Sequence, residues 1–313
     1  MPWRAVHGLV LAGALLGGLV LSLLVGALVG RYEVSVALIW PPWAVLVVEG
    51  WYSRLGPHQR PVSLSLARAM AGTIVVVALW ELFAYVLDNR LAIVPLGDVW
   101  AAFVDLVSSG LLWTHLAVSA QEFALGYGLA AVVGIGAGLL LATNARFADY
   151  VDPWLSFLYA VPLVAIAPLI IVVLGIGIVG KVVVVFLVVV FVVIVNTQVG
   201  VRSTDPQLIE AARSFSATRW TIFRRVLLPA ALPFIVAGLR LGVARGLVGV
   251  VVAELFGARA GLGYLIQTSA QVFRTAHLLV GVLVLAIAGY VGVELLKYVE
   301  RRLAPYRNFE YRD

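Results

Sequence analysis

The chain of 313 residues is 63% hydrophobic and only 12% charged, and its mean hydropathy is +1.05. This composition excludes a soluble globular domain and predicts a polytopic membrane protein. The net charge of +6 could suggest a nucleic-acid partner, but the arginines flank apolar runs, so membrane orientation explains them and no nucleic acid is expected. Because cysteine is absent and the four histidines are scattered without ligand spacing, no metal site is expected either.

The apolar runs are predicted to be membrane-spanning helices. A backbone in lipid must satisfy its own hydrogen bonds, and the runs are too long and too unalternating for barrel strands. Residues 1–52 are predicted to form an N-terminal hairpin with spans at Leu9–Val29 and Val34–Trp51. A polar cytoplasmic linker, residues 53–65, follows the hairpin.

Residues 66–300 are predicted to form the core of the molecule. An amphipathic helix in the outer interface is expected at residues 99–113. With a cytoplasmic tail at residues 301–313, the chain has about eight spans and both termini inside, which leaves most arginines in cytoplasmic segments. The six core spans are expected at Leu66–Leu87, Leu116–Ala142, Tyr150–Leu174, Val182–Val199, Pro233–Phe256 and His277–Tyr298.

A polar, arginine-bearing island, residues 205–233, lies between two of these spans. Asp205 is a good N-cap and Pro206 suits the first helical position, so a short helix is predicted from Pro206 to about Phe215. Thr218 can cap a second short helix, which the prolines at positions 229 and 233 are expected to close before the next span opens. The island therefore predicts a helix-turn-helix on the cytoplasmic side of the membrane.

This island resembles the EAA loop of ATP-binding-cassette (ABC) importer permeases. It carries Glu210-Ala211-Ala212, then Ser216, then Val226, Leu228 and Pro229 at the spacing of the family pattern, with serine and valine at positions 216 and 226 where the family has glycine and isoleucine. Serine tolerates a left-handed turn less readily than glycine. The resemblance implies a coupling helix that docks on a separate ATPase subunit, and the residues assigned to it are Pro206, Glu210, Ala211, Ala212, Ser216 and Arg219.

The resemblance extends from about residue 66 to residue 298 and is to the branch that imports nitrate, sulfonates, taurine and thiamine-pyrimidine precursors. It implies an all-α fold with a six-helix type I permease core behind a two-helix N-terminal extension. It also implies a homodimer in the prokaryotic inner membrane, with two cytoplasmic ATPase subunits and an extracytoplasmic substrate-binding protein. The chain itself would then be no enzyme and would bind no cofactor, since ATP and Mg are held by the ATPase.

Residues 175–181 satisfy the GxxxxGK spacing of a phosphate-binding loop, but Val182 stands where a serine or threonine would bind magnesium. This glycine cluster is also expected at an outer turn between spans rather than in a nucleotide-binding domain. ATP must therefore be handled by a partner.

Charged residues inside the predicted spans are the candidates for the translocation path. An intramembrane charge is kept only where it faces the bundle interior or an aqueous path. Arg240 and Arg245 either line the path or pair with carboxylates such as Glu81, Glu122 or Glu254, and both interpretations stay open. The candidate path residues are Glu122, Asn196, Arg240, Arg245 and Glu254.

The seventh span carries Gly238, Gly242 and Gly246 at intervals of four residues, which predicts close packing against another helix. Its path-facing side is expected at residues 243, 247 and 250.

Glu122 stands where relatives that import nitrate or sulfonate often carry an arginine, which favours a neutral or cationic substrate, such as a pyrimidine or flavin precursor, over an anion. The alternative function is a secondary transporter that couples to an ion gradient through Glu81, Glu122 or Glu254. The EAA island discriminates against it, because an ion-coupled carrier needs no docking helix.

Overall fold

The computed structural model describes residues 93–303, together with residues 72, 76–77, 79–84 and 86. The predicted hairpin of residues 1–52, the linker of residues 53–65 and nearly all of the tail lie outside the described residues. The chain divides into two compact units, Met1–Ala101 and Ala102–Asp313, and each is described by itself.

In the first unit, the described residues between positions 76 and 86 are helical. The indole of Trp80 donates a hydrogen bond to the carbonyl of Val94 (2.9 Å), and the amide of Leu96 donates one to the carboxylate of Glu81 (3.0 Å). Helix α4 (Leu96–Ser108) begins in this unit and confirms a helix at the predicted amphipathic stretch. The helix ends earlier than predicted, because Gly110 adopts a left-handed conformation (φ 78°) that interrupts the helical path before the next helix begins.

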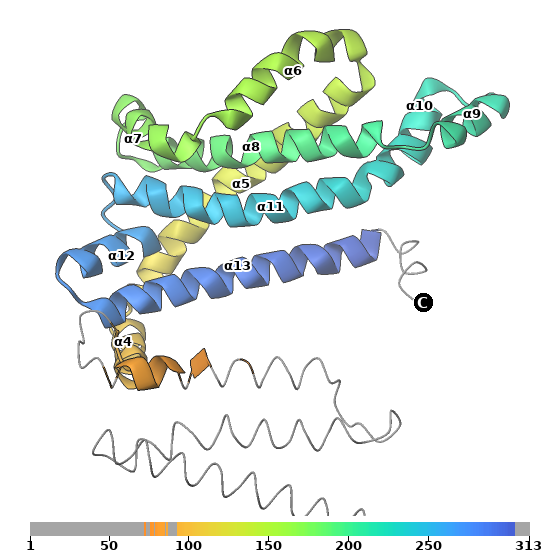
Figure 1. Cartoon of the computed structure of the whole chain (residues 1–313). Helices are drawn as coiled ribbons and strands as arrows, with labels where there is room; N and C mark the ends of the chain where they lie inside the picture. The colour runs from red at the N-terminus through yellow and green to blue at the C-terminus, as the bar shows by residue number, and fades with distance from the viewer. Residues whose placement is uncertain (1–71, 73–75, 78, 85, 87–92, 304–313) are drawn as a thin grey trace, which may run out of the picture. The chain divides into compact units, whose positions relative to one another are not determined.

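The second unit is a bundle of helices in which no strand occurs among the described residues (Figure 1). Four helical runs are long and apolar enough to cross a membrane: α5 (Leu111–Thr143), α8 (Ile178–Arg202), the run Arg219–Leu255 that contains α11 (Leu228–Leu255), and α13 (Thr275–Leu303). Helices α6 (Ala145–Ala160) and α7 (Leu163–Leu174) form a bent pair that makes a fifth crossing if it is one span. The prediction of an all-α membrane protein is confirmed.

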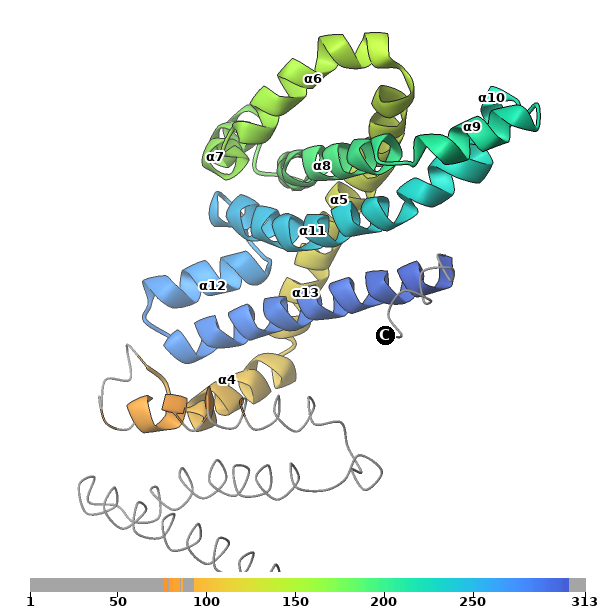
Figure 2. The same cartoon turned by 45° about the vertical axis from the view of Figure 1, so that its right-hand side comes forward.

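Helix α8 packs against both α5 and α11 and carries the centre of the core (Figures 1 and 2). Its valines Val185, Val189 and Val193 are fully buried. Glycines on α5 let the two helices approach closely: a Cβ atom added to Gly134 would lie 2.8 Å from the Cβ atom of Val193, and one added to Gly138 would lie 2.6 Å from that of Thr197. Small residues at these positions therefore set the distance between the helices.

The stretch Tyr150–Leu174, predicted as one span, is not a single straight helix. The chain bends by 94° between α6 and α7, at Val161 and Pro162. Val161 is extended (φ −66°, ψ 129°), as the residue before a proline prefers to be. The other two prolines of this stretch, Pro153 and Pro168, lie inside helices.

The predicted break at the prolines of the seventh span is also wrong. Helix α10 (Arg219–Ile222), the π-helix η2 (Phe223–Leu227) and α11 follow one another without an interruption. The amide of Leu228 donates to the carbonyl of Phe223, five residues back. Because Pro229 then stands in the first turn of α11, its missing N–H breaks no hydrogen bond that the helix needs.

Helix α12 (Leu262–Gln271) connects α11 to α13 and packs beside both. The sequence had shown no separate helix there. Positive backbone φ angles at Gly257 (99°) and Gly261 (129°) turn the chain from α11 into α12.

Candidate functional site

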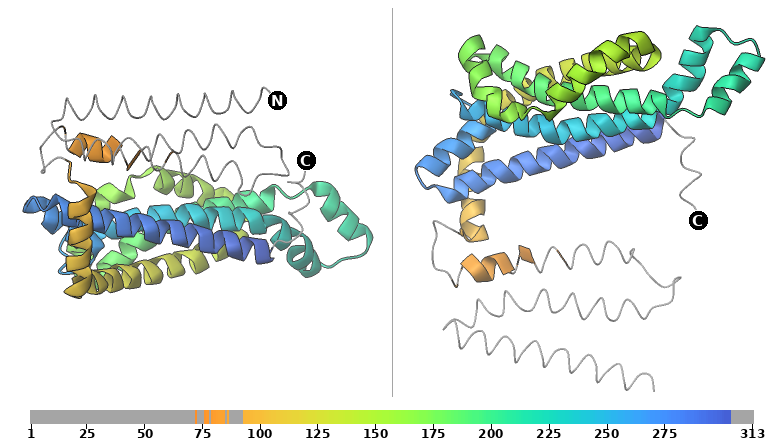
Figure 3. Two further views of the ribbon diagram at one scale, coloured as in Figure 1. Left: turned by 90° about the horizontal axis from the view of Figure 1, so that it is seen from below. Right: turned by 45° about the horizontal axis from the view of Figure 1, so that its top comes forward.

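The first candidate site is the hairpin formed by α9 (Pro206–Ser214) and α10, which projects beyond the ends of α8 and α11 (Figure 3). No residue of α9 is buried. Large apolar side chains of the hairpin are nevertheless exposed: Leu208 by 54%, Trp220 by 67% and Phe215 by 87%. An exposed apolar patch on a projecting element is typical of a protein-protein contact.

Local hydrogen bonds build the hairpin as the sequence predicts. The Asp205 carboxylate accepts from the amide of Gln207 (2.8 Å), and Pro206 occupies the first turn of α9. The Thr218 hydroxyl accepts from the amide of Thr221 (3.2 Å) and caps α10. These caps satisfy amides that a helix start leaves without an intrahelical partner.

Ser216 adopts the left-handed conformation (φ 58°) at the turn between the two helices. Its amide donates to the carbonyl of Arg213 (2.8 Å), and the amide of Ala217 donates to the carbonyl of Ala212 (3.1 Å). A serine therefore adopts the left-handed conformation at the position where the family pattern has a glycine, at a cost on the order of 1 kcal/mol.

The remaining assigned residues of the hairpin lie on its surface. Glu210, Ala211 and Arg219 are exposed, and Ala212 is partly buried. Glu210 makes no ion pair with any described residue. The surface thus offers a carboxylate beside small side chains, which is the arrangement expected of the docking helix, and the docking role of these residues stays a prediction.

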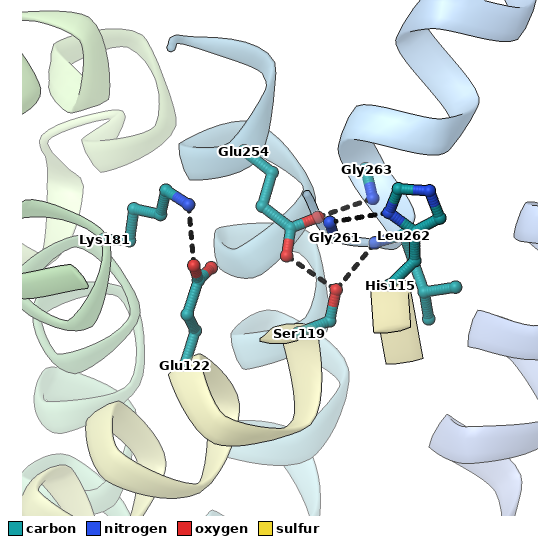
Figure 4. A network of polar contacts seen from close by, with 8 residues as sticks. All are labelled: His115, Ser119, Glu122, Lys181, Glu254, Gly261, Leu262 and Gly263. Atoms are coloured by element: carbon teal, nitrogen blue, oxygen red, sulfur yellow. Dashed lines mark hydrogen bonds and ion pairs between the residues drawn. The ribbon is translucent and has the colours of Figure 1, made fainter. Parts of the chain in front are cut away.

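The second candidate site is a polar cluster at the opposite end of the bundle (Figure 4). The Lys181 ammonium of α8 and the Glu122 carboxylate of α5 form an ion pair of 2.7 Å, with exposed side-chain fractions of only 8% and 2%. Glu254, at the end of α11, is fully buried beside them. Its carboxylate accepts hydrogen bonds from the Ser119 hydroxyl (2.6 Å) and from the amide of Gly263 (2.5 Å).

This cluster holds the turn between α11 and α12 against α5. The Ser119 hydroxyl accepts from the amide of Leu262 (2.7 Å), and the Nδ1 atom of His115 accepts from the amide of Gly261 (3.0 Å). A side chain at Gly261 would collide with the Glu254 carboxylate, so only glycine fits there. The amides at the start of α12 are satisfied by side chains of α5 and α11 instead of water.

Sequence reasoning missed Lys181, which was noticed only as the end of the GxxxxGK pattern. A signal was present, since His115, Ser119 and Glu122 are spaced by four and three residues and share the buried face of α5.

The ion pair between Lys181 and Glu122 also removes the basis for predicting a cationic substrate. Glu122 is neutralised by a lysine of its own chain, not by the arginine that was considered.

The two arginines of the seventh span have different surroundings. Arg240 pairs with Glu300 of α13 (3.5 Å), which is none of the three carboxylates proposed as partners. Arg245 lies over the ring of Tyr159 (5.3 Å to the centroid) and donates to its hydroxyl (3.3 Å). Glu81 accepts from an amide of the first unit, as described above.

Asn196, the last candidate path residue, donates from its side-chain amide to the carbonyl of Val192 (2.8 Å) one turn back in α8. The structure therefore brings Glu122 and Glu254 into one cluster and places Asn196, Arg240 and Arg245 elsewhere. The path roles of all five residues stay predictions.

Arg245 borders a cavity of about 520 Å³ between the α6–α7 bend, α8 and α11, and it is the only charged residue among those that line it. A second cavity, of about 560 Å³, borders Glu122, Lys181 and Arg259 at the end of the bundle that carries the polar cluster.

The faces of α11 are not arranged as predicted. Gly238, Gly242 and Gly246 do lie against other helices, with Asn196 and Val189 of α8 and Phe123 of α5 next to them. The predicted path-facing residues are wrong, because Val243 and Val250 are buried and Leu247 is partly buried. Positions 243 and 247 pack against glycines of α13, and the open face of α11 carries Leu241, Ala244, Arg245 and Val248.

Comparison with known proteins adds three findings. The family model described as "Binding-protein-dependent transport system inner membrane component" matches residues 132–305. The aliphatic sulfonates transport permease protein SsuC of Bacillus subtilis (strain 168) is 34% identical over 75% of this chain and 85% of its own length. The riboflavin transport system permease protein RibX of Chloroflexus aurantiacus is 36% identical over 66% of this chain and 76% of its own length.

A likeness of fold extends to a solved structure, the MetNI methionine ABC transporter in inward-facing conformations. One of its chains matches with a TM-score of 0.54 and 22% identity, over 62% of this chain and 96% of that chain.

Proposed function

The chain belongs to the family of binding-protein-dependent transport system inner membrane components, and from this premise we propose that it forms the translocation path of an ATP-driven importer of small organic nutrients. As a member of that family it is an ABC transporter permease and a multi-pass membrane protein, not an enzyme. The observation that carries the proposal is the exposed α9–α10 hairpin, which is continuous in helical structure with α11.

The complete importer is proposed to contain two copies of this chain, two cytoplasmic ATPase subunits and an extracytoplasmic binding protein. The family's description, which names dependence on a binding protein, supports the presence of that binding protein. ATP and Mg would be bound by the ATPase subunits, and this chain would bind no cofactor.

The proposed location is a prokaryotic inner membrane, with the hairpin and both termini on the cytoplasmic side. Exposed arginines on the hairpin and on η2, which follows it, support this orientation, because short segments rich in arginine stay in the cytoplasm. They are Arg213, Arg219, Arg224 and Arg225.

The substrate is proposed to be a small organic molecule of the class handled by the relatives, whose names refer to aliphatic sulfonates and to riboflavin. The contacts of the three acidic residues disfavour an ion-coupled carrier. Glu81 accepts a backbone amide, Glu122 pairs with a lysine, and Glu254 accepts two hydrogen bonds.

The test uses two substitutions on the hairpin in the full chain, expressed with its ATPase subunit and binding protein. Glu210→Arg reverses the charge of the docking surface, and Ala212→Trp adds bulk to it. Both are expected to abolish co-purification of the ATPase and ATP-dependent uptake together, while the amount of permease in the membrane stays normal. Asp149→Arg, the same change of charge at an exposed position of α6, is the matched control and should leave both intact. Normal uptake with the ATPase still bound in both hairpin variants would contradict the proposed coupling.

A further inference from the structure

Arg245 is the one charged residue that lines the cavity between the α6–α7 bend, α8 and α11. No carboxylate of the described residues balances its charge. Among the described residues, no carboxylate lies within 4.0 Å of a guanidinium nitrogen of Arg245. Its contacts there are the ring and hydroxyl of Tyr159. By contrast, two other basic residues of the described spans pair with carboxylates: Arg240 with Glu300, and Lys181 with Glu122.

Arg245 lies far from the ends of its helix. It stands ten residues before Leu255, which at 1.5 Å per residue is about 15 Å from the end of α11. An arginine at such a depth costs at least about 2.5 kcal/mol on insertion scales and is kept only beside an aqueous path or a partner charge. Its side chain is exposed and borders the cavity, so its charge faces the cavity and can interact with what the cavity holds.

We propose that Arg245 and Tyr159 form a binding site for the anionic group of an organic substrate within the translocation path. The inference rests on the proposed function only in placing this cavity on that path. A guanidinium binds sulfonate or carboxylate oxygens through two parallel N–H groups, which an ammonium cannot reproduce.

Tyr159 completes the site. Its hydroxyl accepts from a terminal nitrogen of Arg245, so the hydroxyl proton is free to point at an anion held by the same guanidinium. The ring beneath the guanidinium fixes the direction of the arginine through a cation–π contact. Because Tyr159 lies two residues before the extended Val161, the bend between α6 and α7 brings this ring to α11.

The rest of the cavity selects the body of the substrate. Its other walls are mainly aliphatic and aromatic side chains, among them Val164, Val188, Phe191 and Val248. A volume of about 520 Å³ is within the range of sites for small organic ligands. A single cation among such walls fits an anion that carries a short apolar chain, such as a short alkanesulfonate or a short-chain carboxylate, and does not fit a bare inorganic ion.

The test exploits the absence of cysteine from the chain. Val248→Cys puts a single thiol on the wall of the cavity, and its rate of labelling by a maleimide is measured in membranes that contain the complete importer. Three probes of equal length are compared: butane-1-sulfonate, butan-1-ol and butylammonium. Only the sulfonate is expected to slow labelling. Adding Arg245→Gln should weaken this protection: the sulfonate concentration needed to slow labelling to half its rate should rise by about tenfold or more. Tyr159→Phe should raise it by a smaller factor.

Arg240→Gln is the matched control, because it removes an arginine of the same helix that already has a carboxylate partner. Protection by the sulfonate should survive it. Equal protection by the alcohol, unchanged protection in Arg245→Gln, or no protection by the sulfonate in the Val248→Cys chain would each overturn the anion site. Loss of the dimer in Arg245→Gln would also overturn it, since Arg245 would then pair with the second copy. The labelling can be repeated on the permease without its ATPase, so failure of the proposed coupling leaves this readout intact.

Discussion

Lys181→Met should be one of the most damaging single substitutions in the chain. The change removes the ammonium from an ion pair of 2.7 Å and leaves the Glu122 carboxylate almost fully buried. The second oxygen of that carboxylate has no hydrogen-bond partner among the described residues, so it supplies no bond that compensates for the lost ion pair. Removing one partner of a buried ion pair typically costs about 3–5 kcal/mol, and we expect a loss of that size in the free energy of unfolding.

The assay is unfolding of the purified chain in dodecyl maltoside, followed by tryptophan fluorescence, for the single variants and for a double-mutant cycle. The double variant Lys181→Met with Glu122→Leu removes both charges and should recover most of the loss, since an apolar pair of similar volume is often as stable as a buried ion pair. A double variant that loses as much as the sum of the two single variants would refute the reasoning.

Lys297→Met provides the matched control. Lys297 and Glu294 also form a short ion pair (2.6 Å), but both side chains are 40% exposed. An exposed pair contributes roughly 0–1 kcal/mol, so this variant should unfold almost as the unchanged chain does. A similar loss in both lysine variants would show that burial does not determine the effect.

Three further predictions follow from local geometry. Ser216→Gly should stabilise the hairpin by about 1 kcal/mol, because glycine adopts the left-handed turn without strain, and it should leave ATPase binding unchanged in the co-purification assay. Gly134→Leu should destabilise the bundle by about 1–3 kcal/mol through overpacking against α8. Gly136→Leu should be tolerated in the same unfolding assay, because a Cβ atom added there would meet no atom of another element within 4 Å. In the complete importer, trapping with ATP should change the maleimide labelling of Val248→Cys but leave Val250→Cys unlabelled in both states, and labelling indifferent to nucleotide at position 248 would exclude α11 as a moving wall.

The features that the sequence predicted correctly depend on short-range contacts. Asp205 caps α9 through an amide two residues on, and Thr218 caps α10 through an amide three residues on. Lipid-spanning runs are equally local, because length and apolar composition alone define them. The hairpin and four of the spans of the second unit could therefore be placed from the residue types.

The features that could not be predicted depend on contacts between distant residues. Lys181 and Glu122 are 59 residues apart, and no sequence spacing relates them. The stretch from residue 150 to residue 174 contains three prolines, and only Pro162 stands at the bend, since tertiary packing holds the other two inside helices. The open face of α11 was misplaced for the same reason. Burial of Val243 depends on a glycine of α13 that only the fold brings to it.

One helical run joins the proposed docking surface to the proposed anion site. Glu254, at its far end, is fixed by hydrogen bonds to α5 and α12, whereas the hairpin at its near end is exposed. At 1.5 Å per residue, Arg245 lies about 14 Å from Glu254, and Arg219 lies about 53 Å from it. If the run turns about its fixed end as a rigid lever, the guanidinium moves by about a quarter of the hairpin's displacement. Small movements suffice at the site, because a charge-assisted hydrogen bond is lost within about 1 Å of its ordinary length. Nitroxide labels at Val248 and Trp220, about 9 Å and about 51 Å from Glu254 on the same scale, should move in a ratio of about one to six when measured between the two copies with and without trapped ATP. Equal movement at both positions would mean that the helix translates as a body and that the polar cluster is no pivot.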